Sequence, residues 1–483
     1  MSSPTTPSLP PRPAFPIRLY NTASRSVEPF APLLEGRVGI YTCGPTVYAP
    51  QHVGNMRSQL FPDLLRRVLE AAGFAVTHVV NITDVGHLTS DADAGDDKVE
   101  AAAARTGRSA ADIAALYTDQ WRHDRARLGC LEPAVLPRAT AHIAEQIALI
   151  EALEAKGVTY RIDDGIYFDT DKWPRYADFA HLRLDEQGTS GRVQNVGEKR
   201  HAADFALWKF SPPGVRRQQE WPSPWGVGFP GWHIECSAMA TKYLGERFDV
   251  HTGGVDHIAV HHTNEIAQSE CGFGVHPWVN YWLHGEFLDL GGAKMSKSAG
   301  GTVVVDDLVA RGIEPLAFRY FFLQAHYRSQ QELTDEALTA AQAALDGLRS
   351  RALDARAAGG AVDPAAVEPY RQRFWAALGD DLNAPEALAV VWSAIRAKDL
   401  TGAEKWAFLL DADDALGLGV ASWEPDEVAV DDLDAEVAAL VAERTEARAT
   451  KDWARADAIR DELASRGLTI VDTPGGIKVK IKR

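Results

Sequence analysis

Apolar and polar positions along the chain first indicate a strand at 38–41, which leads into the turn Thr42-Cys-Gly-Pro45. Apolar residues then recur at helical spacing from 61 to 72, and Gly73 supplies a helix cap. The β-branched run at 75–82 predicts another strand. This strand–helix–strand order favours an α/β fold with a doubly wound parallel sheet, which binds its ligand at the strand ends.

Residues 101–225 interrupt this pattern and predict a mixed insertion. Helical spacing is found around 109–128 and 139–156, and a hairpin-like patch follows at 159–169. The strand and helix pattern resumes at 248–271. The insertion therefore divides one α/β domain into two halves.

The rest of the chain is predicted to be mainly helical. Residues 325–422 are rich in alanine, leucine and arginine, and an acidic, proline-containing linker follows at 423–433. Beyond it we expect one long helix over 434–466 and a short strand-like tail. At the other end, residues 1–16 contain six prolines and predict a disordered leader.

Composition narrows the class of protein. No apolar run approaches the ~18 residues that span a bilayer, and no signal peptide is recognisable, so a cytoplasmic protein without a membrane role is expected. The net charge of −17 argues against nucleic-acid binding by bulk electrostatics, although it permits a local basic surface. Four scattered cysteines are too few for a disulfide scaffold and favour use of one or two in metal binding or chemistry; they are Cys43, Cys130, Cys236 and Cys271.

The first chemical motif is the segment 41–48 followed by His52, Gly54 and Asn55. A histidine that opens a helix, with a glycine two residues later, lets side chain and backbone approach a phosphate at the helix N-terminus. Taken alone, a histidine–glycine pair is too common to define a function.

The second motif is Lys294-Met-Ser-Lys297-Ser, preceded by two glycines. Two lysines in such a loop can neutralise charge that develops on a polyphosphate, although an exposed polar loop would look similar. The two motifs, in this order on a strand–helix framework, resemble those of the class I aminoacyl-tRNA synthetases. That resemblance implies that they bind ATP and stabilise the transition state of adenylation.

A third cluster consists of groups that suit zinc: Cys43, Cys236, His261 and Glu265. His261 and Glu265 are four residues apart and project from one face of a helix. A buried thiol that acts only as a small apolar residue is the alternative for each cysteine. Cys43 directly precedes the proposed phosphate-binding helix, which would place a metal beside the nucleotide.

The segments TCGPTVY, GWHIECSAM, HHTNEIAQS, VNYWLHG and KMSKS resemble the cysteinyl-tRNA synthetase family, and the similarity extends from about residue 17 to the C-terminus. The resemblance implies that the third cluster holds one zinc ion and that Lys294 and Lys297 contact ATP. It also implies an amino-acid pocket formed by Trp232, Thr83, His251 and Asp256.

The family resemblance also implies an architecture and a reaction. A Rossmann-type catalytic domain (17–100 and 226–324) would hold the connective insertion 101–225, and a helical bundle (325–422), a linker and an anticodon-binding domain (434–483) would follow. The enzyme would activate L-cysteine with ATP, with Mg²⁺ assisting, and transfer it to the 3′ end of tRNA(Cys) as a monomer. Zinc would select the thiol, because packing alone discriminates poorly between serine and cysteine.

Two positions depart from the family pattern. Asn55 stands where a second histidine is usual, and an amide cannot carry positive charge, so we expect slower activation. Ten residues, Gly86 to Gly95, are inserted before Asp96-Asp-Lys98 relative to the family pattern. This insert could be a passive solvated loop or a gate over the pocket, and the sequence leaves both interpretations open.

Contacts with RNA are expected near the C-terminus. A stripe at helical spacing combines Arg444, Arg448, Lys451 and Arg455. The alternative is a solvated helix with internal salt bridges, because acidic residues are interleaved. The segment KDWARADAIRD resembles the anticodon-recognising end of the same family, and HYRSQ and DDLNAPEAL resemble its helical bundle.

Three rival functions remain. A ligase that joins cysteine to an amino-sugar shares the catalytic features but lacks the RNA-binding module, so residues 430–483 count against it. A non-catalytic tRNA-binding paralogue is supported only by Asn55. A zinc hydrolase would leave both nucleotide motifs unexplained.

Overall fold

The central sheet of the protein has four parallel strands in the order β10-β9-β3-β4. They are β3 (Arg37–Thr42), β4 (Ala75–Val80), β9 (Phe248–Gly254) and β10 (Val279–Gly285). The predicted doubly wound parallel sheet is confirmed. The computed structural model describes residues 9–86, 98–181, 198–211, 214, 217–290, 303–425, 427–428, 433–473 and 476–481.

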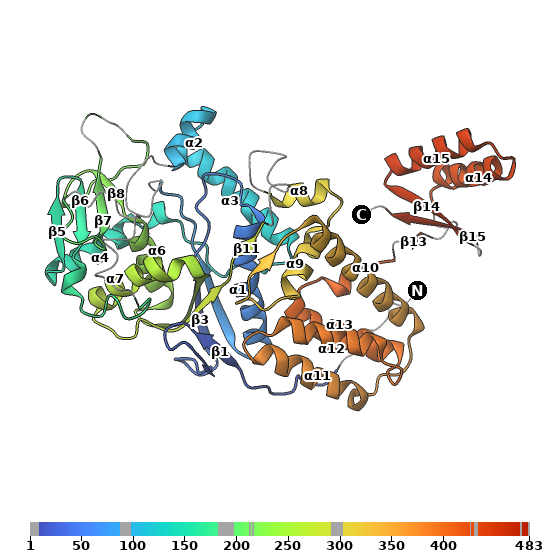
Figure 1. Ribbon diagram of the computed structural model, residues 1–483, viewed down its shortest axis with the longest axis horizontal. Coiled ribbons are helices and arrows are strands. Elements are labelled where there is room, and N and C mark those ends of the chain that lie inside the picture. The colour runs from blue at the N-terminus through green and yellow to red at the C-terminus, as the bar shows by residue number, and fades with distance from the viewer. Residues whose placement is uncertain are drawn as a thin grey trace.

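Helices cover both faces of this sheet (Figure 1). Neighbouring residues of β3 point to opposite faces: Ile40 joins the core around α1 (Val53–Ala71), and Tyr41 joins the core around α6 (Trp232–Leu244). The apolar spacing predicted for 61–72 lies within α1, which begins earlier because His52 caps it. Since β3 pairs with β9, the two halves of the domain meet there, and the loops after all four strands converge.

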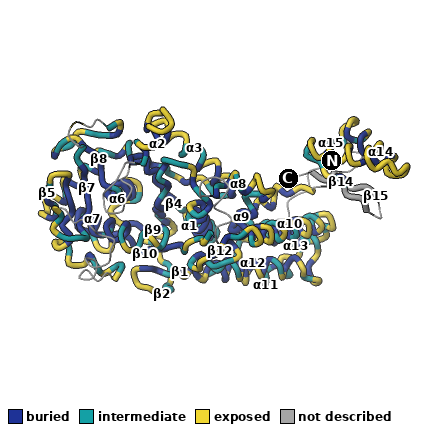
Figure 2. Tube along the Cα trace, turned by 45° about the horizontal axis from the view of Figure 1, so that its top comes forward, coloured by how far each residue is buried: buried dark blue, intermediate teal, exposed yellow. Residues whose placement is uncertain are grey.

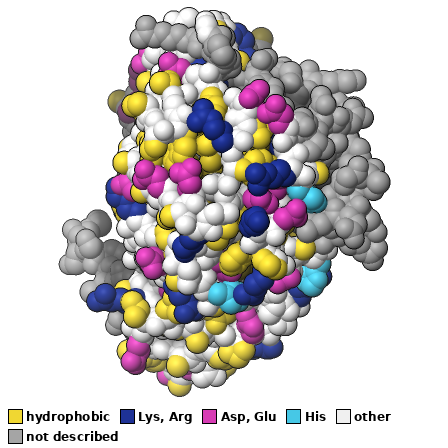
Figure 3. All heavy atoms as spheres, turned by 90° about the vertical axis from the view of Figure 1, so that its left-hand side faces the viewer, with side chains coloured by type: hydrophobic (Ala, Val, Ile, Leu, Met, Phe, Trp, Pro, Cys, Tyr) yellow, Lys and Arg dark blue, Asp and Glu magenta, His cyan; other side chains and the backbone are white. Residues whose placement is uncertain are grey.

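The insertion forms a second, antiparallel sheet in the order β5-β6-β7-β8, with helices beside it. The predicted helices and hairpin are confirmed, and β8 continues this sheet beyond residue 225. Basic and acidic side chains are interspersed on the face at this end of the molecule (Figure 3). The elements are α2 (Lys98–Thr106), α3 (Ala110–Arg127), α4 (Ile143–Ala155), β5 (Thr159–Ile162), β6 (Gly165–Phe168), β7 (Phe205–Phe210) and β8 (Gly228–Pro230).

A helical bundle follows the catalytic domain, as expected, and shares its core with α1. Residues 9–16, expected to be a disordered leader, lie against this bundle: Phe15 stacks on Trp375, and Arg12 pairs with Asp411 at 3.1 Å. The remaining elements before the bundle are β1 (Arg18–Asn21), β2 (Ser26–Pro29), α7 (Thr263–Phe273), β11 (Leu288–Asp289), α8 (Val305–Ala310) and α9 (Pro315–Leu323). The strand β12 (Gln331–Glu332) and the bundle helices follow, which are α10 (Asp335–Ala358), α11 (Pro364–Gly379), α12 (Ala384–Arg396) and α13 (Gly402–Leu416).

The C-terminal unit corrects one expectation, because the single long helix predicted over 434–466 is wrong. Two helices, α14 (Ala435–Ala449) and α15 (Trp453–Ser465), pack against each other. Lys451 has a φ of +62°, which ends the first helix, and the Asp452 side chain accepts from Arg455 N to begin the second. A three-stranded sheet completes the unit, with β13 (Glu427–Val428), β14 (Leu468–Thr473) and β15 (Gly476–Ile481).

Burial is concentrated in the catalytic domain and the bundle, whereas α14 and α15 expose most of their surface (Figure 2). Among the described residues, no helix is long and apolar enough to cross a membrane.

Candidate active site

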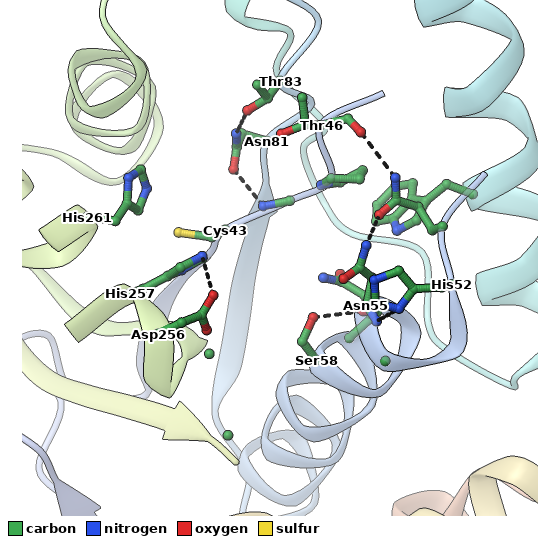
Figure 4. A pocket seen from close by; sticks show the side chains of 18 of the residues that line it. Cys43, Thr46, His52, Asn55, Ser58, Asn81, Thr83, Asp256, His257 and His261 are labelled. Atoms are coloured by element: carbon green, nitrogen blue, oxygen red, sulfur yellow. Dashed lines mark hydrogen bonds and ion pairs between the residues drawn. The ribbon is translucent and has the colours of Figure 1, made fainter. Parts of the chain in front are cut away.

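A pocket of about 580 Å³ lies where the loops after the four parallel strands converge. Cys43 follows β3, Thr83 follows β4, Asp256 follows β9 and Glu286 follows β10, and all four line it. In Figure 4 Cys43 and His261 stand on one side of the pocket, and His52 and Asn55 on the other. The pocket therefore has a side rich in metal-binding groups and a side formed by a helix N-terminus.

The turn after β3 depends on Gly44. Its backbone N–H donates to Asn81 Oδ1 at 2.8 Å, and a Cβ at this position would lie 1.6 Å from the backbone oxygen of Asn81. Asn81 also donates from Nδ2 to Thr83 Oγ1 at 3.0 Å. This close approach places Cys43 and Thr83 beside each other at the base of the pocket.

The helix side of the pocket begins at His52. Its Nδ1 accepts from Asn55 N at 3.2 Å, so this nitrogen carries no proton and Nε2 can donate. Burial lowers the pKa of His52, which keeps the ring neutral. A Cβ on Gly54 would lie 2.9 Å from the His52 ring, which explains the glycine of the motif. Asn55 Nδ2 donates to Gln51 Oε1 at 2.8 Å.

The predicted third cluster is assembled on the other side. One donor atom from each of Cys43, Cys236, His261 and Glu265 lies within 4.8 Å of the others. A second group of possible metal ligands consists of Cys43, His251, His262 and Glu265. Its two histidines do not line the pocket. Three members of the first group, Cys43, Cys236 and His261, line the pocket, and Glu265 is buried next to His261. A π-turn (Ile258–His262) leads into α7, and together they bring His261 and Glu265 to one face, 2.7 Å apart.

Buried charges and hydrogen bonds hold this cluster. His251 Nε2 lies 2.8 Å from Glu265 Oε2. Burial raises the pKa of Glu265, but His251 and His261 outweigh this effect and hold the pKa well below its usual range. Burial raises the pKa of the Cys43 thiol, whereas that of Cys236 is lowered, chiefly by its hydrogen bond with Cys43. Glu265 is therefore anionic without help from a metal.

A second set of buried groups lies behind Cys43. His262 Nε2 is 3.4 Å from Cys43 Sγ, His262 Nδ1 is 2.7 Å from His284 Nε2, and His284 Nδ1 is 2.7 Å from Thr22 Oγ1. No role for His262 or His284 follows from the sequence. His262 is the second of the adjacent histidines that begin HHTNE, and His284 lies near the end of VNYWLHG.

The expected amino-acid pocket is partly assembled. Trp232 lines the pocket and stacks on His261, with ring centroids 4.2 Å apart, and Thr83 and Asp256 line it as well. His251 is fully buried behind Glu265 and orients that carboxylate, so it does not form part of the pocket wall. Lys98, which received no role from the sequence, also lines the pocket.

Two groups of predicted residues lie elsewhere. Lys294 and Lys297 fall outside the described residues. In the C-terminal unit Arg444 is buried and Arg455 pairs with Glu443 at 2.7 Å, so the four cations do not form one exposed stripe. Arg448 lies 5.6 Å from the ring centre of the exposed Trp453, an aromatic residue that the stripe pattern missed.

Comparison with solved structures identifies proteins with a similar fold. It is similar to a Mycobacterium tuberculosis methionyl-tRNA synthetase bound by methionyl-adenylate, with a TM-score of 0.52 and 16% identity over 80% of this chain and 90% of that one. It is also similar to a LeuRS of Agrobacterium radiobacter K84 in complex with tRNA and LeuAMS, with a TM-score of 0.55 and 12% identity over 81% and 85%. Because residues 29–343 also match the class I (C) tRNA synthetase catalytic domain, this fold is that of a class I tRNA synthetase.

Sequence comparison gives the family. The model of the class I (C) tRNA synthetase catalytic domain matches residues 29–343, and that of the cysteinyl-tRNA ligase anticodon binding domain matches 430–479. Cysteine–tRNA ligase 1 of Burkholderia lata is 53% identical over 95% of this chain and 96% of its own length. The cysteine–tRNA ligase of Treponema denticola is 38% identical over 95% and 98%. The chain belongs to the cysteine–tRNA ligase family.

Proposed function

We propose that this protein activates L-cysteine with ATP and transfers it to the 3′ end of tRNA(Cys) in the cytoplasm, as a monomer. The observation that carries the proposal is the pocket itself, which joins residues that could hold a thiol-binding metal to a helix N-terminus suited to phosphate. The family's two matched domains and its full-length relatives support both halves of the reaction.

The donor set fits a zinc ion. Two thiols, an imidazole and an anionic carboxylate are typical zinc ligands. All four residues are buried, and Cys43, Cys236 and His261 line the pocket. When bound, zinc would prefer the cysteine thiolate to the neutral hydroxyl of serine. Trp232 lies beside His261 at the mouth of the cluster and would exclude a side chain larger than cysteine.

The other side of the pocket would bind ATP. The neutral His52 can donate from Nε2 to a phosphate oxygen, and Gly54 leaves room for that ring to turn toward the ligand. Lys98 adds a cation to the same wall. Lys294 and Lys297 would neutralise charge that develops on the leaving pyrophosphate, and Mg²⁺ would assist ATP binding.

The C-terminal unit would recognise tRNA. Arg448 and Lys451 lie at the end of α14, close to the exposed Trp453 at the start of α15. Exposed aromatic rings next to cations favour stacking with unpaired bases. Arg444 would support this unit from within rather than contact RNA.

The test is aminoacylation by the zinc-loaded protein with ATP, tRNA and labelled cysteine or serine. Label from cysteine alone in acid-precipitable RNA would establish the reaction. Cysteine-dependent ATP–pyrophosphate exchange without charging of tRNA would instead favour the amino-sugar ligase. Absence of both activities would favour the non-catalytic paralogue.

The metal assignment needs its own test. Elemental analysis of the purified protein should give one zinc per chain, and Cys236→Ala should lower this content. Charging of serine by the native protein at a rate near that of cysteine would contradict selection by the metal.

A further inference from the structure

The part of α1 nearest the pocket carries a buried arginine, Arg57. Neither the sequence motifs nor the proposed reaction gives this residue a role. Arg57 is 4% exposed and lies one helical turn after Val53. It does not line the pocket. Among the described residues, no carboxylate lies within ion-pair distance of its guanidinium. The Glu286 charge favours the protonated form, but a buried cation without an ion pair is costly, so its role needs a specific explanation.

The guanidinium instead binds three uncharged acceptors on two different segments. It donates to the backbone oxygen of Glu286, to that of Ser329 at 2.8 Å, and from Nε to Gln331 Oε1 at 3.4 Å. Burial lowers the pKa of Arg57 to about 10, which still leaves it charged at neutral pH. A planar guanidinium with fixed donors can hold three such groups at once, whereas an ammonium cannot hold them in the same geometry.

The first acceptor belongs to a wall of the pocket. Residues 285–288 line it, and Glu286 N donates to Tyr327 O at 2.9 Å while β11 pairs with β12 in parallel. Arg57 therefore ties α1 to this wall directly through Glu286 and indirectly through 329–331. The same helix binds a second segment at its start, where Val53 N donates to Val303 O at 2.8 Å.

The helical bundle secures the same connection from outside. Tyr327 stacks on Phe61 of α1 with ring centroids 5.1 Å apart, and its hydroxyl donates to Asp381 Oδ1 at 2.8 Å. Arg328 donates from Nε to Asp381 Oδ2 at 2.8 Å, and Tyr20 N donates to Asp381 Oδ1 at 2.8 Å. The segment that Arg57 binds is thus itself held by the bundle and by β1.

We propose that Arg57 is a positioning residue for adenylation, which sets the wall at Glu286–Leu288 against the α1 N-terminus. His52 and Gly54 at the α1 N-terminus and residues 286–288 line the same pocket, so the bond from Arg57 to Glu286 O fixes their relative position where ATP would bind. The metal cluster is built from other elements and does not depend on this connection. The inference rests on the proposed function.

The test is Arg57→Met, measured by cysteine-dependent ATP–pyrophosphate exchange with active sites counted from the burst of adenylate. We expect the KM for ATP to rise and the rate per active site to fall about 10- to 100-fold, because small displacements of reacting groups are costly. The KM for cysteine and the zinc content should change less than about twofold. Arg57→Lys should recover part of the loss, since it keeps the charge but places its donors on a single nitrogen.

The matched control is Arg66→Met, on the same helix but only partly buried, with a side chain 16% exposed and paired with Glu70 at 2.8 Å. It should leave both KM values and the rate unchanged. An unchanged ATP step in Arg57→Met, or equal effects on ATP and cysteine, would overturn the proposal. If Arg57→Met does not fold, Gln331→Met decides: a rise in the KM for ATP of about 3-fold or more supports the role, and no rise overturns it. Absence of exchange by the unmodified protein would instead refute the proposed function.

Discussion

Arg319 of α9 donates from Nη2 to Oδ2 of Asp63 in α1 at 2.7 Å, and both side chains are 1% exposed. Asp63 also accepts from Arg67 Nε at 2.8 Å and from Leu131 N at 2.6 Å. Arg319 donates further to the backbone oxygen of Leu416. This buried network joins α1 to the insertion and to the helical bundle.

Asp63→Asn is expected to destabilise the protein strongly, by about 3 to 5 kcal/mol, because it leaves the Arg319 charge buried without its partner. Chemical denaturation followed by circular dichroism measures this. The control is Asp306→Asn, which removes an exposed partner of Arg127 and should cost less than about 1 kcal/mol. The double variant Asp63→Leu with Arg319→Met should be more stable than Asp63→Asn. Equal effects of Asp63→Asn and the control would contradict this account.

Stability should depend on pH through His78. Burial, together with Arg125 and Arg66, lowers the pKa of His78 to about 3 from 6.5, and its Nε2 lies 2.9 Å from Thr42 Oγ1. The unfolded chain takes up a proton below pH 6.5 but the folded protein does not, so stability falls as the pH falls from 6.5 toward 3. His78 should account for about 2 kcal/mol between pH 6.5 and 5.

The measurement for His78 is the free energy of unfolding against pH for the native protein and for His78→Gln. The variant should show a shallower dependence over this interval, because glutamine does not titrate. Parallel curves for the two proteins would show that His78 does not contribute.

Gly44→Ala should disrupt the base of the pocket. The added methyl would lie 1.6 Å from the backbone oxygen of Asn81, so the turn that carries Cys43 must move. We expect a lower zinc content and loss of most cysteine-dependent exchange. Gly347→Ala is the control: its Cβ meets only Trp392 at 3.8 Å, and a helical glycine replaced by alanine should gain about 0.5–1 kcal/mol. Normal zinc content in Gly44→Ala would contradict the assigned geometry.

Asn55→His should speed adenylation. Asn55 is exposed and its amide is held by Gln51, and an imidazolium at this position would add positive charge beside the phosphates. Single-turnover formation of the adenylate, compared between the two proteins at saturating ATP, gives the answer. A slower variant would show that the amide is the better group in this chain.

The cations of the C-terminal unit should divide into two classes. Lys451→Gln and Arg448→Gln should weaken tRNA binding and reduce its dependence on salt. Arg444→Gln should instead lower the thermal stability of the unit, because this side chain is 5% exposed. Filter binding at several salt concentrations and thermal unfolding separate these effects. A salt dependence that is reduced by Arg444→Gln alone would reverse the assignment.

The sequence by itself determined the parallel sheet, the helix that follows His52 and the four groups that suit a metal. These predictions follow from two facts: the period of apolar residues reports secondary structure, and the residue type fixes which ligand atoms a side chain can offer. That Cys43 and Cys236 belong to one metal site was inferred from the family resemblance rather than from any local pattern. Lys294, Lys297 and the Gly86–Gly95 insert remain predictions, since they fall wholly or mostly outside the described residues.

Only the tertiary structure decided which polar side chains are buried. Arg57 and Arg444 look like exposed helical cations in the sequence, yet packing places both below 6% exposure. The break at Lys451 and the docking of residues 9–16 were missed for a related reason. A turn at a non-glycine residue and an aromatic stack on a distant helix are stabilised by contacts between remote segments, which local propensity does not report.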